Sequence, residues 1–142
     1  MWQIESPVLA IFGTSSQQGK FSLQIELRKR FLHDGYKLKQ ISTEPMGYFF
    51  GMDYTCPIEF NGSIELKDSE LTKFFNLIMH KCDQSDTDMI MVGGQSSILH
   101  HSLYNEKYFS LLRNRCTSFI NVYHFNCGVS FFNALQCVII YK

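Results

Sequence analysis

The chain of 142 residues has the length of a single domain, and we expect one domain over residues 1–142. Its composition, with 45% hydrophobic and 18% charged residues, is typical of a globular protein and excludes a disordered tail or a collagen-like rod. Thirteen Lys and Arg balance thirteen Asp and Glu, so no net charge attracts nucleic acid or an anionic membrane, and we expect neither partner.

Strand-like and helix-like segments alternate along the first part of the chain. A continuous apolar run over residues 7–12 predicts a strand that is buried on both faces. Apolar residues about four positions apart predict a helix over residues 20–33, which Asp34-Gly35 ends. A second strand, less apolar and nearer an edge of the sheet, is expected over residues 36–42.

An irregular stretch rich in Gly and Pro follows over residues 43–62. Apolar side chains at i, i+3, i+4 and i+7 predict a second helix over residues 69–81, and a buried strand is expected over residues 89–92. The last expected elements are a helix over 103–113, a strand over 119–125, and either a helix over 130–140 or a strand over 138–141.

This alternation predicts an α/β fold, with a mostly parallel sheet of about four to five strands and helices on both faces. Ligands of such sheets bind outside the carboxyl ends of the strands. We therefore expect functional residues in the loops over residues 13–20, 43–56, 93–101 and 126–128.

The loop after the first strand has the order of a P-loop: a buried strand, a loop bounded by glycines, a lysine, a hydroxyl residue and a helix. Its backbone N–H groups and the positive end of the next helix favour an anion. Lys20 adds a mobile charge for terminal phosphates and is also the expected catalytic cation, and Ser22 offers a hydroxyl to Mg²⁺. The predicted phosphate-binding residues are Gly13, Thr14, Ser15, Ser16, Gln17, Gln18, Gly19, Lys20, Phe21 and Ser22.

The spacing of this loop departs from the common pattern GxxxxGK[ST]. Five residues separate Gly13 from Gly19, and Phe21 follows the lysine directly. The alternative interpretation is therefore a polar turn between strand and helix, capped by Ser15 or Ser16.

The loop resembles the dethiobiotin-synthetase-like branch of P-loop proteins, whose loops read like GTDxxxGKT, in its Gly13-Thr14, Gly19 and Lys20. It is more similar to the P-loop domain of the D-glutamate N-acetyltransferase-like family, formerly a domain of unknown function, whose loop reads like GTDCAVGKxT. The resemblance implies that Phe21 fills the additional position and that Ser22 takes the hydroxyl role. It is loose over residues 7–126 and specific only at the loop.

Other polar residues are expected at the same edge of the sheet. The acidic residue that follows Gly-Thr in the resembling families is Ser15 here, which makes Glu44 and Asp53 the candidate metal ligands; alternatively, both are solvated loop carboxylates. Gln95 is placed to orient a water or a carbonyl as a second catalytic residue. Asn126 is placed to hydrogen-bond a purine, or is a turn-forming Asn before a glycine.

Three functions remain open. The resemblance implies a nucleotide-binding domain that uses ATP with Mg²⁺, or an N-acetyltransferase-type domain whose loop holds the phosphates of an acyl-CoA such as acetyl-CoA. The third is a non-catalytic subunit or regulatory module. Whether the protein is an enzyme is left open. Because the resembling families have longer chains, we expect an incomplete P-loop domain that forms a homodimer or pairs with a second subunit.

Localisation and cysteine chemistry follow from two further patterns. No stretch approaches the ~18 apolar residues of a membrane span, and residues 1–6 lack the features of a signal peptide, so we expect a cytoplasmic protein. The cysteines are odd in number and none are CxxC-spaced, which predicts free thiols. They are Cys56, Cys82, Cys116, Cys127 and Cys137.

Overall fold

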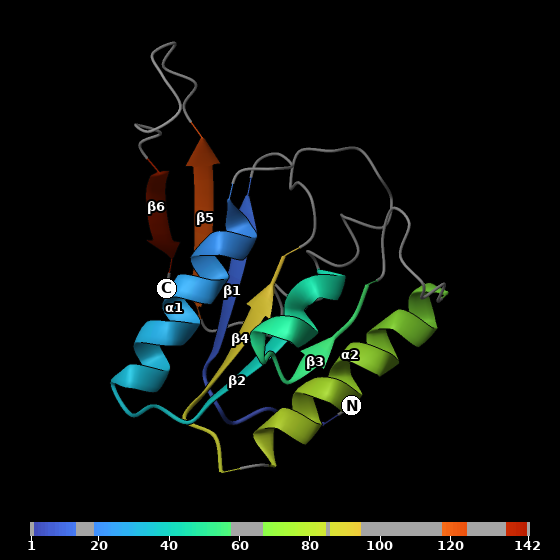
Figure 1. The fold of residues 1–142 in the computed structure, drawn as a ribbon. Coiled ribbons are helices and arrows are strands. Elements are labelled where there is room, and N and C mark those ends of the chain that lie inside the picture. The colour runs from blue at the N-terminus through green and yellow to red at the C-terminus, as the bar shows by residue number, and fades with distance from the viewer. Residues whose placement is uncertain are drawn as a thin grey trace.

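The computed structural model describes residues 2–13, 19–57, 67–84, 86–94, 118–124 and 136–141. Strands and helices alternate along its first half, as the apolar patterns predict (Figure 1). The elements are β1 (Val8–Gly13), α1 (Lys20–His33), β2 (Leu38–Ser42), the 3₁₀ helix η1 (Pro45–Phe50), β3 (Tyr54–Thr55), α2 (Asp68–Asp83), β4 (Met89–Gly93), β5 (Ser118–His124) and β6 (Gln136–Tyr141).

The strands form one sheet in the order β3-β2-β4-β1-β5-β6. Every neighbouring pair is parallel except β5 and β6, which are antiparallel. The predicted α/β class with a mostly parallel sheet is therefore confirmed. Within the described residues the sheet has six strands rather than four or five, because β3 adds a short edge strand and β6 adds an antiparallel strand at the other edge.

Two expected segments differ in the structure. Within the stretch 43–62, which was expected to be irregular, Pro45 begins η1 and residues 54–55 pair with β2. The helix alternative over 130–140 is wrong at its end, because residues 136–141 form β6 along β5. The β-branched run in this segment favours a strand over a helix. The helix expected over 103–113 lies outside the described residues.

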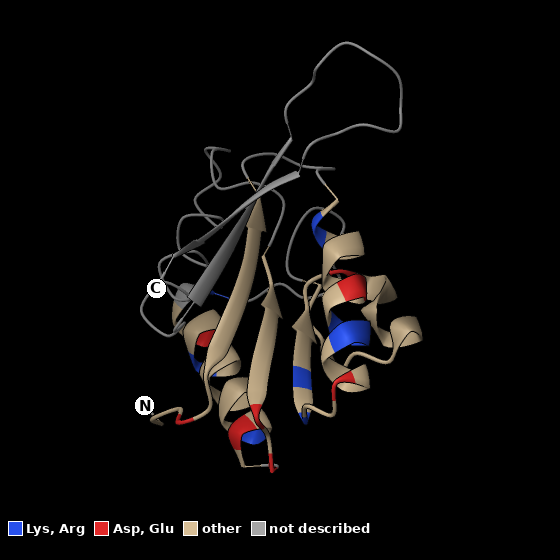
Figure 2. Cartoon of the chain, turned by 90° about the vertical axis from the view of Figure 1, so that its left-hand side faces the viewer, with Lys and Arg blue, Asp and Glu red and all other residues tan. Residues whose placement is uncertain are grey.

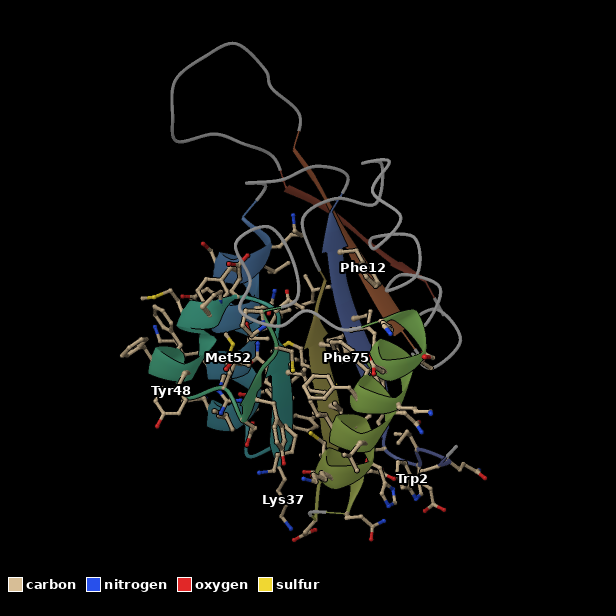
Figure 3. All side chains as sticks on the ribbon, turned by 90° about the vertical axis from the view of Figure 1, so that its right-hand side faces the viewer. Trp2, Phe12, Lys37, Tyr48, Met52 and Phe75 are labelled. Atoms are coloured by element: carbon tan, nitrogen blue, oxygen red, sulfur yellow. The ribbon has the colours of Figure 1, made fainter. Side chains whose placement is uncertain are left out.

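The two long helices cover opposite faces of the sheet. The path from β1 through α1 to β2 crosses the sheet in one direction, and the path from β2 through α2 to β4 returns. Right-handed crossovers that run in opposite directions place their helices on opposite faces. Successive side chains of β1 point to opposite faces of the sheet and so belong to two parts of the core. Ala10 and Phe12 pack with Phe75 of α2, whereas Leu9 and Ile11 pack on the side of α1. In Figure 3, Phe75 points from α2 into the sheet.

The central strands of the sheet are apolar. No Lys, Arg, Asp or Glu occurs in β1 or β4, and Figure 2 shows the described charges mainly on the helices and connecting segments. Strands without charges suit a layer that is buried on both faces. In the part of the chain that the structure describes, no helix is long and apolar enough to cross a membrane.

Candidate functional site

The fold brings several predicted site residues together at the carboxyl ends of the parallel strands. β1 ends at Gly13, β2 at Ser42 and β4 at Gly93, and α1 begins at Lys20. The chain leaves β1 toward β2 on one side, whereas β5 lies on the other side of β1. Open α/β sheets bind their ligands at such a change of direction. The loop residues outside the described part of the chain are Thr14, Ser15, Ser16, Gln17 and Gln18.

Gly19 turns the chain into α1. Its φ of 80° and ψ of 16° are left-handed, a conformation that is strained for residues with a Cβ. Its carbonyl accepts a hydrogen bond from the backbone N–H of Leu23 (N–O 2.9 Å). No side chain caps the helix, and the first turn contains no acidic residue. The positive end of α1 is thus not neutralised by its own first turn, which favours an anion at this point.

Lys20 is the first residue of α1 and is buried, with 8% of its surface exposed. Burial lowers the pKa of its ammonium, and the nearby charge of Glu44 partly offsets this effect. A dehydrated ammonium gains more from an anionic ligand than one in water does. Lys20 therefore has both the position and the electrostatic environment of a phosphate-binding lysine.

Gly93, the last residue of β4, and Gly94, which follows it, lie beside β1. A Cβ on Gly93 would lie 2.5 Å from Oε1 of Gln24, and a Cβ on Gly94 would lie 2.5 Å from the carbonyl oxygen of Ile11. The N–H of Gly94 donates to that same carbonyl (N–O 2.7 Å). The absence of side chains at Gly93 and Gly94 therefore allows close contact with α1 and with β1.

A buried pair of amides that was not predicted from the sequence lies one helical turn beyond Lys20. Gln24, one helical turn after Lys20, is 2% exposed, and Gln40 of β2 is fully buried. Nε2 of Gln40 donates to Oε1 of Gln24 at 3.4 Å. Oε1 of Gln40 has no hydrogen-bond partner among the described residues. The sequence feature that could have predicted this pair is a polar residue four positions after Lys20, in the middle of an apolar stripe.

Comparison with known proteins agrees with this geometry. A family model described as "Domain of unknown function (DUF1611_C) P-loop domain" matches residues 2–125. The chain belongs to this P-loop family. Its membership confirms the predicted P-loop domain, whereas the finer resemblance to the dethiobiotin-synthetase-like branch and to the D-glutamate N-acetyltransferase-like family stays a prediction.

One solved structure has a similar fold. It is the C-terminal Sua5 domain of a hypothetical Sua5 protein from Pyrococcus horikoshii, with 17% sequence identity and a TM-score of 0.52. The match covers 84% of this chain and 98% of that one. At this identity the likeness concerns the fold alone. A search of curated proteins found no match.

Asp53 of the P-loop domain has a structural role. Its carboxylate accepts hydrogen bonds from the backbone N–H of Gln40 (2.9 Å) and from Nζ of Lys39 (2.9 Å), and Arg28 lies 3.4 Å away. Its own N–H donates to the carbonyl of Gln40 (3.0 Å). Two cations and a backbone amide therefore occupy this carboxylate, which argues against Asp53 as a magnesium ligand.

Glu44 and Ser22 remain as oxygen donors near the lysine. Glu44 is exposed just beyond β2, and its charge acts on Lys20. Ser22 is exposed in the first turn of α1. The predicted residues Gln95 and Asn126 lie outside the described residues, so their roles stay predictions.

Proposed function

We propose that this P-loop domain binds the phosphates of a nucleotide, ATP with Mg²⁺, through residues 13–22. The observation that carries the proposal is the buried Lys20, whose pKa is lowered by burial. It directly follows a left-handed glycine at an uncapped helix N-terminus. A lysine and the backbone amides of a helix N-terminus at one point are the components that P-loop proteins use for terminal phosphates.

In this proposal each group of residues has a separate role in binding. Backbone amides at the start of α1 bind phosphate oxygens, and Lys20 neutralises the charge that builds up on them. Glu44 and Ser22 suit Mg²⁺, because it prefers a small number of carboxylate or hydroxyl oxygens from the protein. When bound, this ion would neutralise part of the phosphate charge. In the same proposal, Gln95 orients a water and Asn126 holds the base.

The second candidate is a domain that binds an acyl-CoA such as acetyl-CoA through the same loop. It is favoured by Asp53, whose carboxylate is already bound by Lys39 and Arg28. It is also favoured by β4, which ends at Gly93 and is followed by Gly94, so that no carboxylate stands at this strand end. Binding of coenzyme A phosphates requires the lysine and the amides but not a set of metal-binding carboxylates. A module that binds phosphate without catalysis is the third candidate.

Thermal unfolding with ATP–Mg²⁺, GTP–Mg²⁺ and acetyl-CoA tests these candidates. A ligand at 100 times its dissociation constant stabilises the folded state by about 2.7 kcal/mol. We expect a clear rise in the melting temperature with ATP–Mg²⁺ that is lost in Lys20→Ala. Lys29→Ala is the matched control, because Lys29 lies on the same helix with an exposed side chain.

The pattern of shifts discriminates among the candidates. A shift with acetyl-CoA alone favours the second one. A Lys20-dependent shift with no turnover of nucleotide or acyl-CoA favours the non-catalytic module. If no ligand raises the melting temperature, or if Lys20→Ala responds like the unchanged chain, the phosphate site is not where we propose it.

A further inference from the structure

The 3₁₀ helix η1 exposes apolar side chains, most of them aromatic, in a nearly unbroken run. Tyr48 and Phe49 are 74% and 78% exposed, and Phe50 and Met46 are about half exposed. Figure 3 shows Tyr48 pointing away from the sheet. We call these four residues the η1 surface. Apolar side chains that gather on a surface are typical of a binding site.

Contacts with β2 and α1 fix the position of the segment that carries the η1 surface. A Cβ on the buried Gly47 would lie 2.6 Å from Cβ of Ser42, so η1 packs closely against the end of β2. The N–H of Met52, which is buried, donates to the carbonyl of Gly47 (3.1 Å). Arg28 of α1 donates to the carbonyl of Gly51. The rings are therefore exposed on a fixed segment.

The η1 surface adjoins the proposed phosphate site. Phe21, the residue after Lys20, contacts Phe50 edge to face, with ring centroids 5.5 Å apart. Glu44, the residue before η1, acts on the charge of Lys20. Phe21 occupies the position where common P-loops carry a hydroxyl residue, and here it joins the loop helix to η1. The η1 surface therefore lies next to the first turn of α1, which carries Lys20.

The area of the surface suits a small molecule. An aromatic side chain has about 150–250 Å² of surface. Weighted by their exposed fractions, the three rings and Met46 offer roughly 500 Å², less than the ~800 Å² that each partner buries in a stable protein complex. The segment 45–52 contains no charged residue, which suits an uncharged group.

We propose that the η1 surface binds the apolar, ring-bearing body of a second small molecule beside the phosphates of the ligand at Lys20. The inference rests on the proposed function. The η1 surface lies on the β2 side of β1, whereas the base of the first ligand is expected at Asn126, after β5 on the other side of β1. The positions proposed for the two molecules therefore differ.

Fluorescence titration with N-phenyl-1-naphthylamine, an uncharged ring-bearing probe, tests this inference. We expect saturable binding that weakens about tenfold in Tyr48→Ser/Phe49→Ser, which removes one or more ring contacts. Leu32→Ser/Leu77→Ser is the matched control, because both leucines are exposed outside η1, and it should bind the probe like the unchanged chain. Saturating ATP–Mg²⁺ or acetyl-CoA should leave probe affinity within twofold.

Three results would overturn the inference. In the first, Tyr48→Ser/Phe49→Ser binds the probe with unchanged affinity. In the second, ATP–Mg²⁺ or acetyl-CoA displaces the probe, so that the surface holds the first ligand itself. In the third, light scattering shows a dimer that the double variant loses, which makes the surface a contact between copies of the chain. Circular dichroism of each variant checks its fold, and the Lys20→Ala melting series separately tests the phosphate site.

Discussion

Gln40 donates a hydrogen bond to Gln24 (Nε2–Oε1 3.4 Å) within the buried layer between α1 and the sheet. Gln24 stands one turn after Lys20, and Gln40 lies on the strand that leads to Glu44. The bond therefore joins the helix that carries the proposed phosphate-binding lysine to the strand that carries the nearby carboxylate. A polar contact inside an apolar layer defines one relative position of the two elements.

The two amides are expected to be coupled, so that removing both lowers the free energy of unfolding by less than the sum of the two single removals. Gln24→Leu leaves the amide N–H of Gln40 buried without a partner, and we expect a loss of about 1–3 kcal/mol in the free energy of unfolding. Gln24→Leu/Gln40→Leu should be less destabilised than the sum of the two single variants. Urea denaturation of the four proteins measures this coupling; additive losses would show that the two amides act independently.

The two glycines at the end of β4 are expected to differ in their tolerance of alanine. The neighbour of an added Cβ is the side chain of Gln24 at Gly93 and the backbone carbonyl of Ile11 at Gly94. A side chain can move more easily than a central strand, so Gly94→Ala should be more destabilising, with a loss of about 1–3 kcal/mol for overpacking. Denaturation midpoints give the comparison, and a milder effect at Gly94 would contradict it.

Asp83 is expected to make a pH-dependent contribution to stability. It accepts hydrogen bonds from the N–H groups of Ser6 (2.8 Å) and Glu5 (3.1 Å). Partial burial acts to raise the pKa of Asp83, but the hydrogen bonds outweigh it and hold the pKa below its ordinary value. The folded state thus prefers the ionised form, so the stabilisation is complete above the unfolded pKa near 3.9 and is lost as pH falls through the folded pKa.

The variant Asp83→Asn measures this contribution. We expect it to be less stable than the unchanged chain at pH 7, by up to about 1 kcal/mol because the site is partly solvated. The difference should shrink as the pH falls below 4. Chemical denaturation between pH 7 and pH 3 tests this trend. A difference that grows toward low pH would assign the opposite sign to the shift.

The thiols of Cys56 and Cys82 are expected to be unreactive in the folded protein. Both are buried and neither forms a disulfide, and burial raises the pKa of Cys56 to about 11 and that of Cys82 to about 12. Thiolate is the reactive form. Alkylation at pH 8 followed by peptide mapping should leave both cysteines unmodified until urea is added, and rapid labelling without denaturant would contradict their burial.

Local patterns in the sequence were sufficient for the regular elements. The helix over residues 20–33 matches α1 at both ends, because a glycine precedes it, a regular apolar stripe defines its length and Asp34-Gly35 follows. Strand β1 begins and ends within one residue of its prediction. Each of these features depends on neighbours within a few residues, which is the range that a sequence pattern covers.

The candidate site was harder to predict from the sequence, because it depends on contacts between residues that are far apart in the chain. Asp53 suggested a loop carboxylate near a metal, but Arg28 and Lys39, which neutralise it, come from α1 and β2. The close fit of Gly93 against Gln24 likewise joins residues far apart in the chain. The exposure of Tyr48 and Phe49 depends on the packing of the buried Gly47. None of these relationships has a period or a spacing that reveals it in the sequence.

The burial of Lys20 would make the proposed phosphate binding a proton-coupled process. Because its pKa is lowered in the free protein, alkaline conditions deprotonate it earlier than an exposed lysine, and a bound phosphate raises the pKa again. Binding in that pH range therefore takes up protons from the buffer, and affinity falls as pH rises through the free-state pKa. Calorimetric binding enthalpies should then change with the ionisation heat of the buffer, and this change should vanish in Lys20→Ala.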